Sequence, residues 1–93
     1  MSDIRMYCTA VCPYCIRADQ LLTRKGVRFE KIRVDLEPER WNEMTAVSGR
    51  NTVPQIFIGE HHVGGFDDLA ELDMAGKLDE LLAPYLSAAS NET

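Results

Sequence analysis

The sequence predicts a single α/β domain, and three observations support that prediction. The chain has 93 residues, the length of one small domain. Its composition, 45% hydrophobic and 27% charged, is that of a globular protein able to bury one core. A strand pattern, a helix pattern and a second strand pattern follow one another within about thirty residues, which implies two parallel strands joined by a right-handed crossover.

The first strand and the first helix have clear local signals. Apolar and polar side chains alternate from Ile4 to Tyr7, so a short strand should end near Cys8, before a loop over residues 9–12. A helix is expected from Pro13 to Lys25, because proline suits the first helical position and apolar residues three and four apart share one face (Ala18, Leu21 and Leu22). Gly26 should end it, since glycine tolerates the left-handed conformation.

A second strand and a second helix are expected next. The apolar alternation from Val27 to Leu36 slips once, so this strand should contain a bulge or begin late. Glu37-Pro38-Glu39 should open a helix that Ser48-Gly49 ends. Trp41, within that helix, is interpreted as a half-exposed packing residue.

The last third of the chain predicts a hairpin and two helices. Val53 to Ile58 and His62-Val63 should be strands joined by Gly59-Glu60. A third helix should be capped by Asp67 or Asp68, and Gly76 should separate it from a fourth helix over Lys77 to Leu86. We therefore expect one domain over residues 1–86 and a polar tail over residues 87–93.

The charge balance and the hydropathy exclude several classes of function. Ten Lys+Arg against fifteen Asp+Glu give a net charge of −5, so a nucleic-acid-binding surface is not expected. The sequence has no apolar run of membrane-spanning length and no signal-peptide core. We expect a cytoplasmic monomer that binds neither nucleic acid nor membrane.

All three cysteines lie close together, which indicates reactive thiols. Cys12 and Cys15 form a C-x-x-C between a strand and a helix, and Cys8 precedes them. At the helix start Cys12 should be stabilised as a thiolate, whereas Cys15, one turn further, should be less exposed and less acidic. The alternatives are a structural or a metal-binding C-x-x-C, but the cysteines with His61 or His62 form no recognisable zinc set, so no metal ligand is assigned.

Three motifs together resemble a dithiol glutaredoxin: Cys12-Pro13-Tyr14-Cys15, Thr52-Val53-Pro54 and Gly64-Gly65-Phe66-Asp67-Asp68. The resemblance implies a thioredoxin-like fold, with a four-stranded mixed sheet flanked by helices and Pro54 in the cis form. It also implies a glutathione-dependent thiol–disulfide oxidoreductase. In that reaction Cys12 attacks a disulfide-containing or glutathionylated protein, and Cys15 resolves the mixed disulfide.

The same resemblance implies a glutathione site, with glutathione as cosubstrate and no bound cofactor. The Val53 backbone should pair with the cysteinyl residue of glutathione, the helix start after Gly65 should receive its γ-glutamyl carboxylate, and Asp67 or Asp68 its ammonium. The predicted glutathione-binding residues are Pro13, Tyr14, Arg40, Thr52, Val53, Pro54, Gly65, Asp67 and Asp68. Without the other motifs, Gly64-Gly65 would read as a turn and either aspartate as a simple helix cap.

Two positions depart from the family pattern. Many glutaredoxins carry a lysine three residues before the first motif cysteine, where this chain has Thr9. Arg40 and Arg50 are the nearest substitutes, although either could be a solvated surface charge. Cys8 is interpreted as a buried or semi-buried bystander thiol.

Two other functions remain open at this stage. Some glutaredoxins hold an iron–sulfur cluster between two subunits through the first cysteine and glutathione, although Pro13 weighs against that function. A non-catalytic adaptor that kept the fold is the other alternative, and the intact cysteine pair weighs against it.

Overall fold

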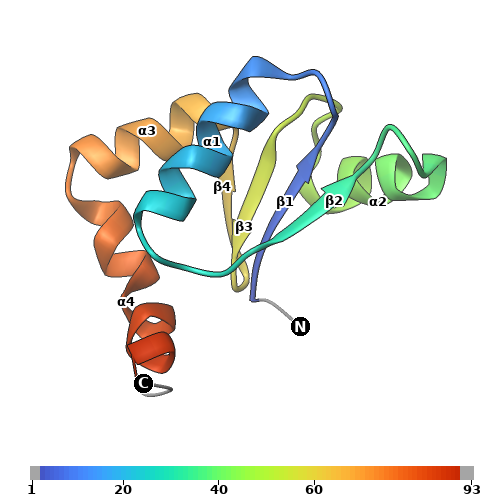
Figure 1. Cartoon of the computed structure of the whole chain (residues 1–93). Helices are drawn as coiled ribbons and strands as arrows, with labels where there is room; N and C mark the ends of the chain where they lie inside the picture. Colours follow the sequence, from blue (N-terminus) through green and yellow to red (C-terminus); the bar gives the residue numbers. More distant parts are fainter. Residues whose placement is uncertain (1–2, 91–93) are drawn as a thin grey trace.

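The computed structural model of the chain describes residues 3–90, which form four strands and four helices (Figure 1). In chain order they are β1 (Ile4–Cys8), α1 (Pro13–Arg24), β2 (Glu30–Arg33), α2 (Pro38–Ser48), β3 (Gln55–Ile58), β4 (His61–Gly64), α3 (Phe66–Met74) and α4 (Lys77–Ser90). In the part of the chain that is described, no helix has the length and apolar character needed to cross a membrane.

The strands form one mixed sheet in the order β2-β1-β3-β4. β1 and β2 are parallel, whereas β3 is antiparallel to both β1 and β4, so the predicted crossover and mixed sheet are confirmed. Tyr7 near the end of β1 pairs with Gln55 at the start of β3, and Ile56 pairs with Gly64 at the end of β4. The loop before α1, the loop before β3 and the start of α3 therefore meet at one edge of the sheet (Figure 1).

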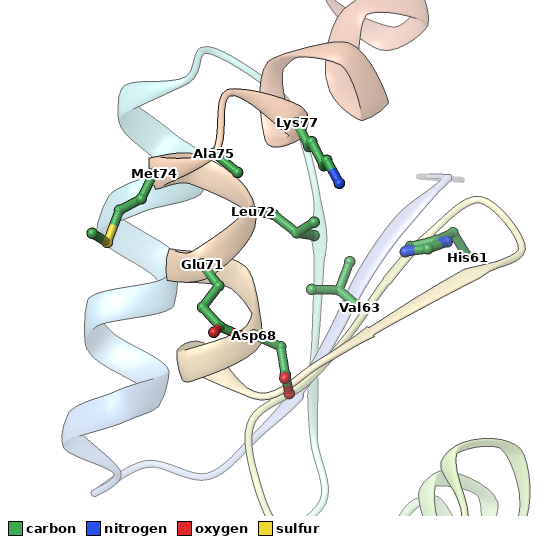
Figure 2. A pocket seen from close by; sticks show the side chains of 8 residues that line it. All are labelled: His61, Val63, Asp68, Glu71, Leu72, Met74, Ala75 and Lys77. Carbon is green, nitrogen blue, oxygen red and sulfur yellow. The ribbon is translucent and has the colours of Figure 1, made fainter.

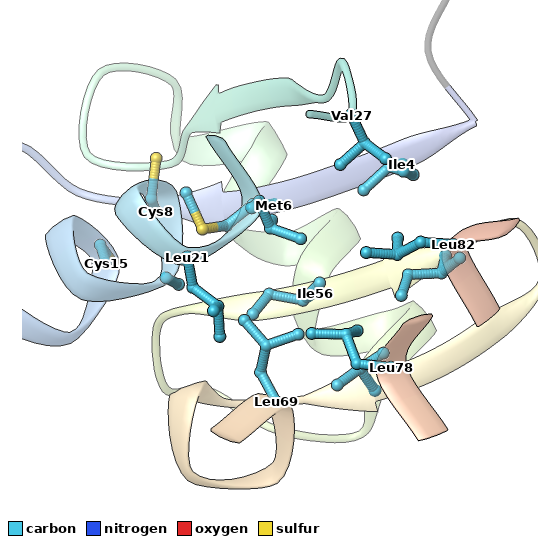
Figure 3. Packing of buried hydrophobic residues seen from close by; sticks show 14 residues of the cluster. Ile4, Met6, Cys8, Cys15, Leu21, Val27, Ile56, Leu69, Leu78 and Leu82 are labelled. Atoms are coloured by element: carbon cyan, nitrogen blue, oxygen red, sulfur yellow. The ribbon is translucent and has the colours of Figure 1, made fainter. Parts of the chain in front are cut away.

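Helices cover both faces of the sheet, with α1 and α3 on one side and α2 on the other (Figure 1). Alternation along β1 sends Ile4, Met6 and Cys8 into the larger core cluster, where residues of α1, α3 and α4 meet the sheet (Figure 3). Tyr7 points to the opposite face and joins the smaller cluster with Met44 of α2. The half-buried Trp41 packs against that cluster, as expected.

β2 begins late, at Glu30 opposite Arg5, which is one of the two outcomes expected where the alternation slips. It ends at Arg33, before the predicted Leu36, and other boundaries also differ from those predicted. β3 begins after Pro54, which has no N–H to contribute to the ladder. α4 continues past Leu86 to Ser90, and residues 91–93 of the expected tail lie outside the described residues.

Candidate active site

Cys12 occupies the N-cap of α1, at the edge of the sheet where the three loops meet. Its backbone is extended (φ −112°, ψ 111°), and Pro13 follows as the first helical residue. The Cys15 backbone N–H donates a hydrogen bond to the Cys12 Sγ over 3.3 Å. The first turn of a helix has N–H groups without helical partners and carries a partial positive charge. Cys12 therefore lies at the helix start, as the motif predicted, with a backbone N–H directed at its sulfur.

Cys15 is the buried member of the pair. Only 4% of it is exposed, whereas Cys12 is half-buried. Burial raises the pKa of the Cys15 thiol to about 12. The hydrogen bond with Cys12 and the charge of Cys12 also raise this pKa, whereas a backbone hydrogen bond with Thr9 lowers it. Cys15 is the less exposed thiol of the two, as the sequence predicted, and it is less acidic than an ordinary cysteine.

The start of β3 lies beside Cys12. The Val53–Pro54 peptide bond is cis, which confirms the expectation from the resemblance. The Cys12 Sγ donates to the Val53 carbonyl over 3.8 Å. The nucleophilic sulfur and the backbone of Val53 are therefore neighbours.

A pocket of about 220 Å³ opens next to this pair of neighbours. Its lining comes from α1, the segment before β3, and the start of α3: Tyr14, Arg50, Thr52, Val53, Pro54, Gln55, Gly65, Phe66, Asp67 and Asp68. Tyr14 is half-exposed, between the guanidinium of Arg17 and the ring of Phe66, whose centroid is 6.4 Å away. Most of the predicted glutathione-binding residues are thus brought together around one pocket.

The two candidate arginines lie in different places. Arg40 pairs with Glu43 over 3.1 Å and with Glu37 over 3.6 Å, and it lines a separate hollow with Asp3 and other residues. That hollow contains none of the residues that line the pocket beside Cys12. Arg50 lines the pocket itself, so the structure brings Arg50, and not Arg40, to this pocket.

Asp68 is already engaged within the fold. Gly65, not an aspartate, is the N-cap of α3, so the predicted cap was wrong. Asp68, three residues later, reaches back and accepts the Gly65 N–H over 3.1 Å, as the third residue of a capping box does. The same Oδ2 pairs with Arg50 over 3.2 Å, and a Cβ at Gly64 would collide with this carboxylate.

The remaining predicted residue, Pro13, is exposed at the start of α1 and does not line the pocket. Sequence reasoning missed Phe66 and Gln55 as lining residues. Phe66 stood inside a motif that was already singled out. Gln55 had a signal of its own, since it is the polar residue in the otherwise apolar run that predicted the third strand.

Cys8 is buried, as the sequence predicted, whereas β4 begins one residue before the predicted strand and contains both histidines. Cys8 is 3% exposed in the core, and burial raises the pKa of its thiol. His61 and His62 are both in β4, where the His62 ring stacks on Phe57 with centroids 4.7 Å apart. Among the described residues, no group of three or more His, Cys, Asp or Glu side chains could hold a metal ion.

A larger hollow, of about 610 Å³, lies between α3 and β4 (Figure 2). Val63 and Leu72 line it together with charged side chains, and Asp68 is the residue that it shares with the pocket beside Cys12. No cysteine lines it. The smaller pocket has no cysteine in its lining either, but Val53 lines it, and the Val53 carbonyl lies 3.8 Å from the Cys12 Sγ.

Comparison with known proteins gives a consistent result. The chain matches the sequence profile of the glutaredoxin family over residues 4–63. A glutaredoxin of Pseudomonas aeruginosa is 58% identical over 83 residues, which cover 89% of this chain and 99% of that protein. Glutaredoxin 3 of Escherichia coli K12 is 49% identical over 82 residues, covering 88% and 99%.

Solved structures agree with the sequence comparison. The solution structure of glutaredoxin from Brucella melitensis is 55% identical, with a TM-score of 0.76 over 88% of this chain and 89% of that one. The crystal structure of a buckwheat glutaredoxin–glutathione complex is 30% identical, with a TM-score of 0.82 over 89% of this chain and 78% of that one.

Proposed function

The chain belongs to the glutaredoxin family and is a glutathione-dependent thiol–disulfide oxidoreductase, and on that premise we propose that Cys12 is its nucleophile and Cys15 its resolving thiol. The observation that carries this assignment is the asymmetry of the pair. Cys12 is half-exposed and accepts a helix N–H, whereas Cys15 is buried and holds its proton tightly.

Reduction of a protein disulfide follows a dithiol route. The Cys12 thiolate attacks one sulfur of the substrate, and the other sulfur leaves as a thiol once it is protonated. The Cys15 thiolate then attacks the Cys12 Sγ, which releases the second substrate thiol and leaves a Cys12–Cys15 disulfide. Two glutathione molecules reduce that disulfide and leave as glutathione disulfide.

Removal of glutathione from a mixed disulfide needs Cys12 alone. The Cys12 thiolate attacks the glutathione sulfur, and the substrate protein leaves as its thiol. The thiolate of a second glutathione then attacks the sulfur of the glutathione bound to Cys12, which forms glutathione disulfide and releases the Cys12 thiolate. The Cys15 thiol is a spectator in this monothiol route. Glutathionylated and disulfide-containing proteins are therefore the proposed partners, and a reducing compartment such as the cytoplasm is the proposed location.

The pocket beside Cys12 is the proposed glutathione site, and its charges match that ligand. Glutathione carries two carboxylates and one ammonium, whereas the pocket is lined by Arg50, Asp67 and Asp68. Because Asp68 is engaged by Gly65 and Arg50, we assign the ammonium to Asp67. Arg50 offers its remaining N–H groups to a carboxylate of glutathione. Arg40 is not assigned this role, because it lines a different hollow.

Backbone pairing accounts for the rest of the proposed site. The buckwheat relative was crystallised as a glutathione complex, which supports the same ligand here. An extended cysteinyl residue laid along Val53 would bring its sulfur toward Cys12, whose Sγ lies 3.8 Å from the Val53 carbonyl.

Two serine variants test the assignment of the cysteines. Cys12→Ser should abolish both activities, whereas Cys15→Ser should still remove glutathione from small mixed disulfides and should lose reduction of protein disulfides. Cys8→Ser is the matched control and should retain both. Equal losses in the Cys12 and Cys15 variants would contradict the proposal, and a visible absorption spectrum of the anaerobically purified protein would support the iron–sulfur alternative instead.

A further inference from the structure

Gln55 is fully buried, with 0% of it exposed, and apart from the hydroxyl of Tyr7 its amide is the polar side-chain group held at that depth among the residues whose burial is described. It is the first residue of β3, immediately after Pro54, and it lines the pocket beside Cys12. A buried amide is costly unless each of its polar atoms has a partner. The hydrogen bonds that satisfy this amide therefore indicate what it does.

Both ends of the Gln55 amide are used. Its Nε2 donates to the Thr52 carbonyl over 3.0 Å and to the Thr52 Oγ1 over 3.2 Å. Since a carbonyl can only accept, the amide nitrogen must face Thr52 and the amide oxygen must face the other way. That oxygen lies 2.8 Å from the Nε2 of His62.

These orientations determine the role of His62. The Gln55 oxygen has no proton, so the His62 Nε2 must carry one and donate it. The ring is held in place by stacking on Phe57, its cross-strand partner. Burial lowers the pKa of His62, the charges of Arg50 and His61 act in the same direction, and the charge of Asp68 opposes them. His62 therefore donates whether or not it gains a second proton.

A continuous set of contacts then connects β4 to the reacting sulfur. His62 holds Gln55, Gln55 holds Thr52 at two atoms, and Thr52 is joined covalently to Val53. The Val53 carbonyl lies next to the Cys12 Sγ. The Gln55 side chain thus holds the Thr52–Val53 segment, which should pair with glutathione, through Thr52 and without a hydrogen bond to the Cys12 Sγ.

We propose that Gln55, supported by His62, is a positioning residue that holds the Thr52–Val53 backbone in the arrangement required to bind a glutathionylated substrate. This inference rests on the proposed role of the Val53 backbone in pairing with glutathione. It predicts an effect on substrate affinity that exceeds any effect on the intrinsic reactivity of Cys12.

Gln55→Met is the principal test, because methionine fills a similar volume but cannot donate to Thr52 and is only a weak acceptor for His62. Loss of a typical hydrogen bond corresponds to roughly a three- to tenfold weaker interaction, so the KM for a glutathionylated peptide should rise by about that factor. The rate at which Cys12 reacts with 2-hydroxyethyl disulfide, a small disulfide with no peptide backbone to pair, should change less than about twofold.

Two further variants separate the two arms of the network. Gln55→Glu can accept from His62 but has no proton for Thr52, and it should raise the KM in the same way as Gln55→Met. His62→Phe keeps a ring to stack on Phe57 and leaves the bonds to Thr52 intact, so it should raise the KM less than either variant of Gln55.

A destabilised control distinguishes positioning from general damage to the fold. Leu82→Ala removes a fully buried side chain of α4 and should lower Tm without changing the KM. An unchanged KM in both Gln55 variants would overturn the proposal. The proposal would also be overturned if the Gln55 variants lost substrate affinity and Cys12 reactivity together, and if Leu82→Ala showed the same two losses at the same Tm. If the wild-type protein showed no preference for the glutathionylated peptide over 2-hydroxyethyl disulfide, the proposed glutathione site itself would be wrong.

Discussion

Burial of Cys15 predicts how the resolving step should depend on pH. In this step the Cys15 thiolate attacks the sulfur of a glutathionylated Cys12, so its rate follows the fraction of Cys15 that is ionised. The pKa of Cys15 is raised to about 12, first by burial and then by its hydrogen bond and charge interaction with Cys12. The interactions with an ionised Cys12 disappear once Cys12 is in a disulfide, but the effect of burial remains.

The magnitude follows from the direction of that shift. A thiol whose pKa stays above its ordinary value is almost wholly protonated at neutral pH, and its thiolate fraction grows about tenfold for each pH unit. Between pH 6.5 and 8.5 the resolving rate should therefore rise roughly a hundredfold without reaching a plateau.

Rapid mixing with glutathione disulfide measures this step directly. Acid quenching followed by mass spectrometry separates the singly glutathionylated protein from the internal disulfide, so formation and decay of the intermediate are followed independently at each pH. Cys15→Ser is the control in which the intermediate should accumulate. A resolving rate that levels off below pH 8 would show that Cys15 ionises near neutrality and would refute the reasoning from burial.

Three other substitutions give separate checks. Cys8→Ala should cost about 1 kcal/mol of stability, because it deletes one buried sulfur. Both activities should stay within about twofold of wild type. Peptide mapping that found Cys8 in the principal disulfide of the oxidised protein would contradict this prediction. Thr9→Lys should lower the KM for a glutathionylated peptide by about two- to fivefold at low salt, with kcat unchanged, because an exposed ion pair contributes about 0.5–1 kcal/mol equally to ground and transition states. The gain should fade at high ionic strength, and an unchanged KM at low salt would mean that Arg50 already satisfies the carboxylate. Asp68→Ala should destabilise the protein by about 1 kcal/mol more than Asp68→Asn in urea denaturation. Both variants lose the half-exposed ion pair with Arg50, but asparagine can still accept the Gly65 N–H. Equal losses of stability would show that the capping hydrogen bond contributes nothing.

The reactive pair was predictable because its signals are local. Cys12, Pro13 and Cys15 lie within one helical turn, so the N-cap, the first helical proline and the neighbouring thiol follow from their spacing and from the strand pattern before them. The same holds for the end of α1 at Gly26, whose φ is 80°. Such features depend on neighbours in the chain, and the tertiary structure leaves them unchanged.

Other features of the site depended on how distant segments pack. Arg40 in the first turn of α2 and Arg50 just after its end have the same charge, and the packing of α2 against the sheet decides that Arg50 reaches the pocket. Gln55 read as one polar residue in an apolar strand, but its burial and its bonds to Thr52 and His62 require β3 and β4 to be paired. The sequence by itself thus determined the chemistry at Cys12 and Cys15, which a single helical turn specifies. The tertiary structure decided which side chains surround that chemistry, because their positions depend on contacts between segments far apart in the chain.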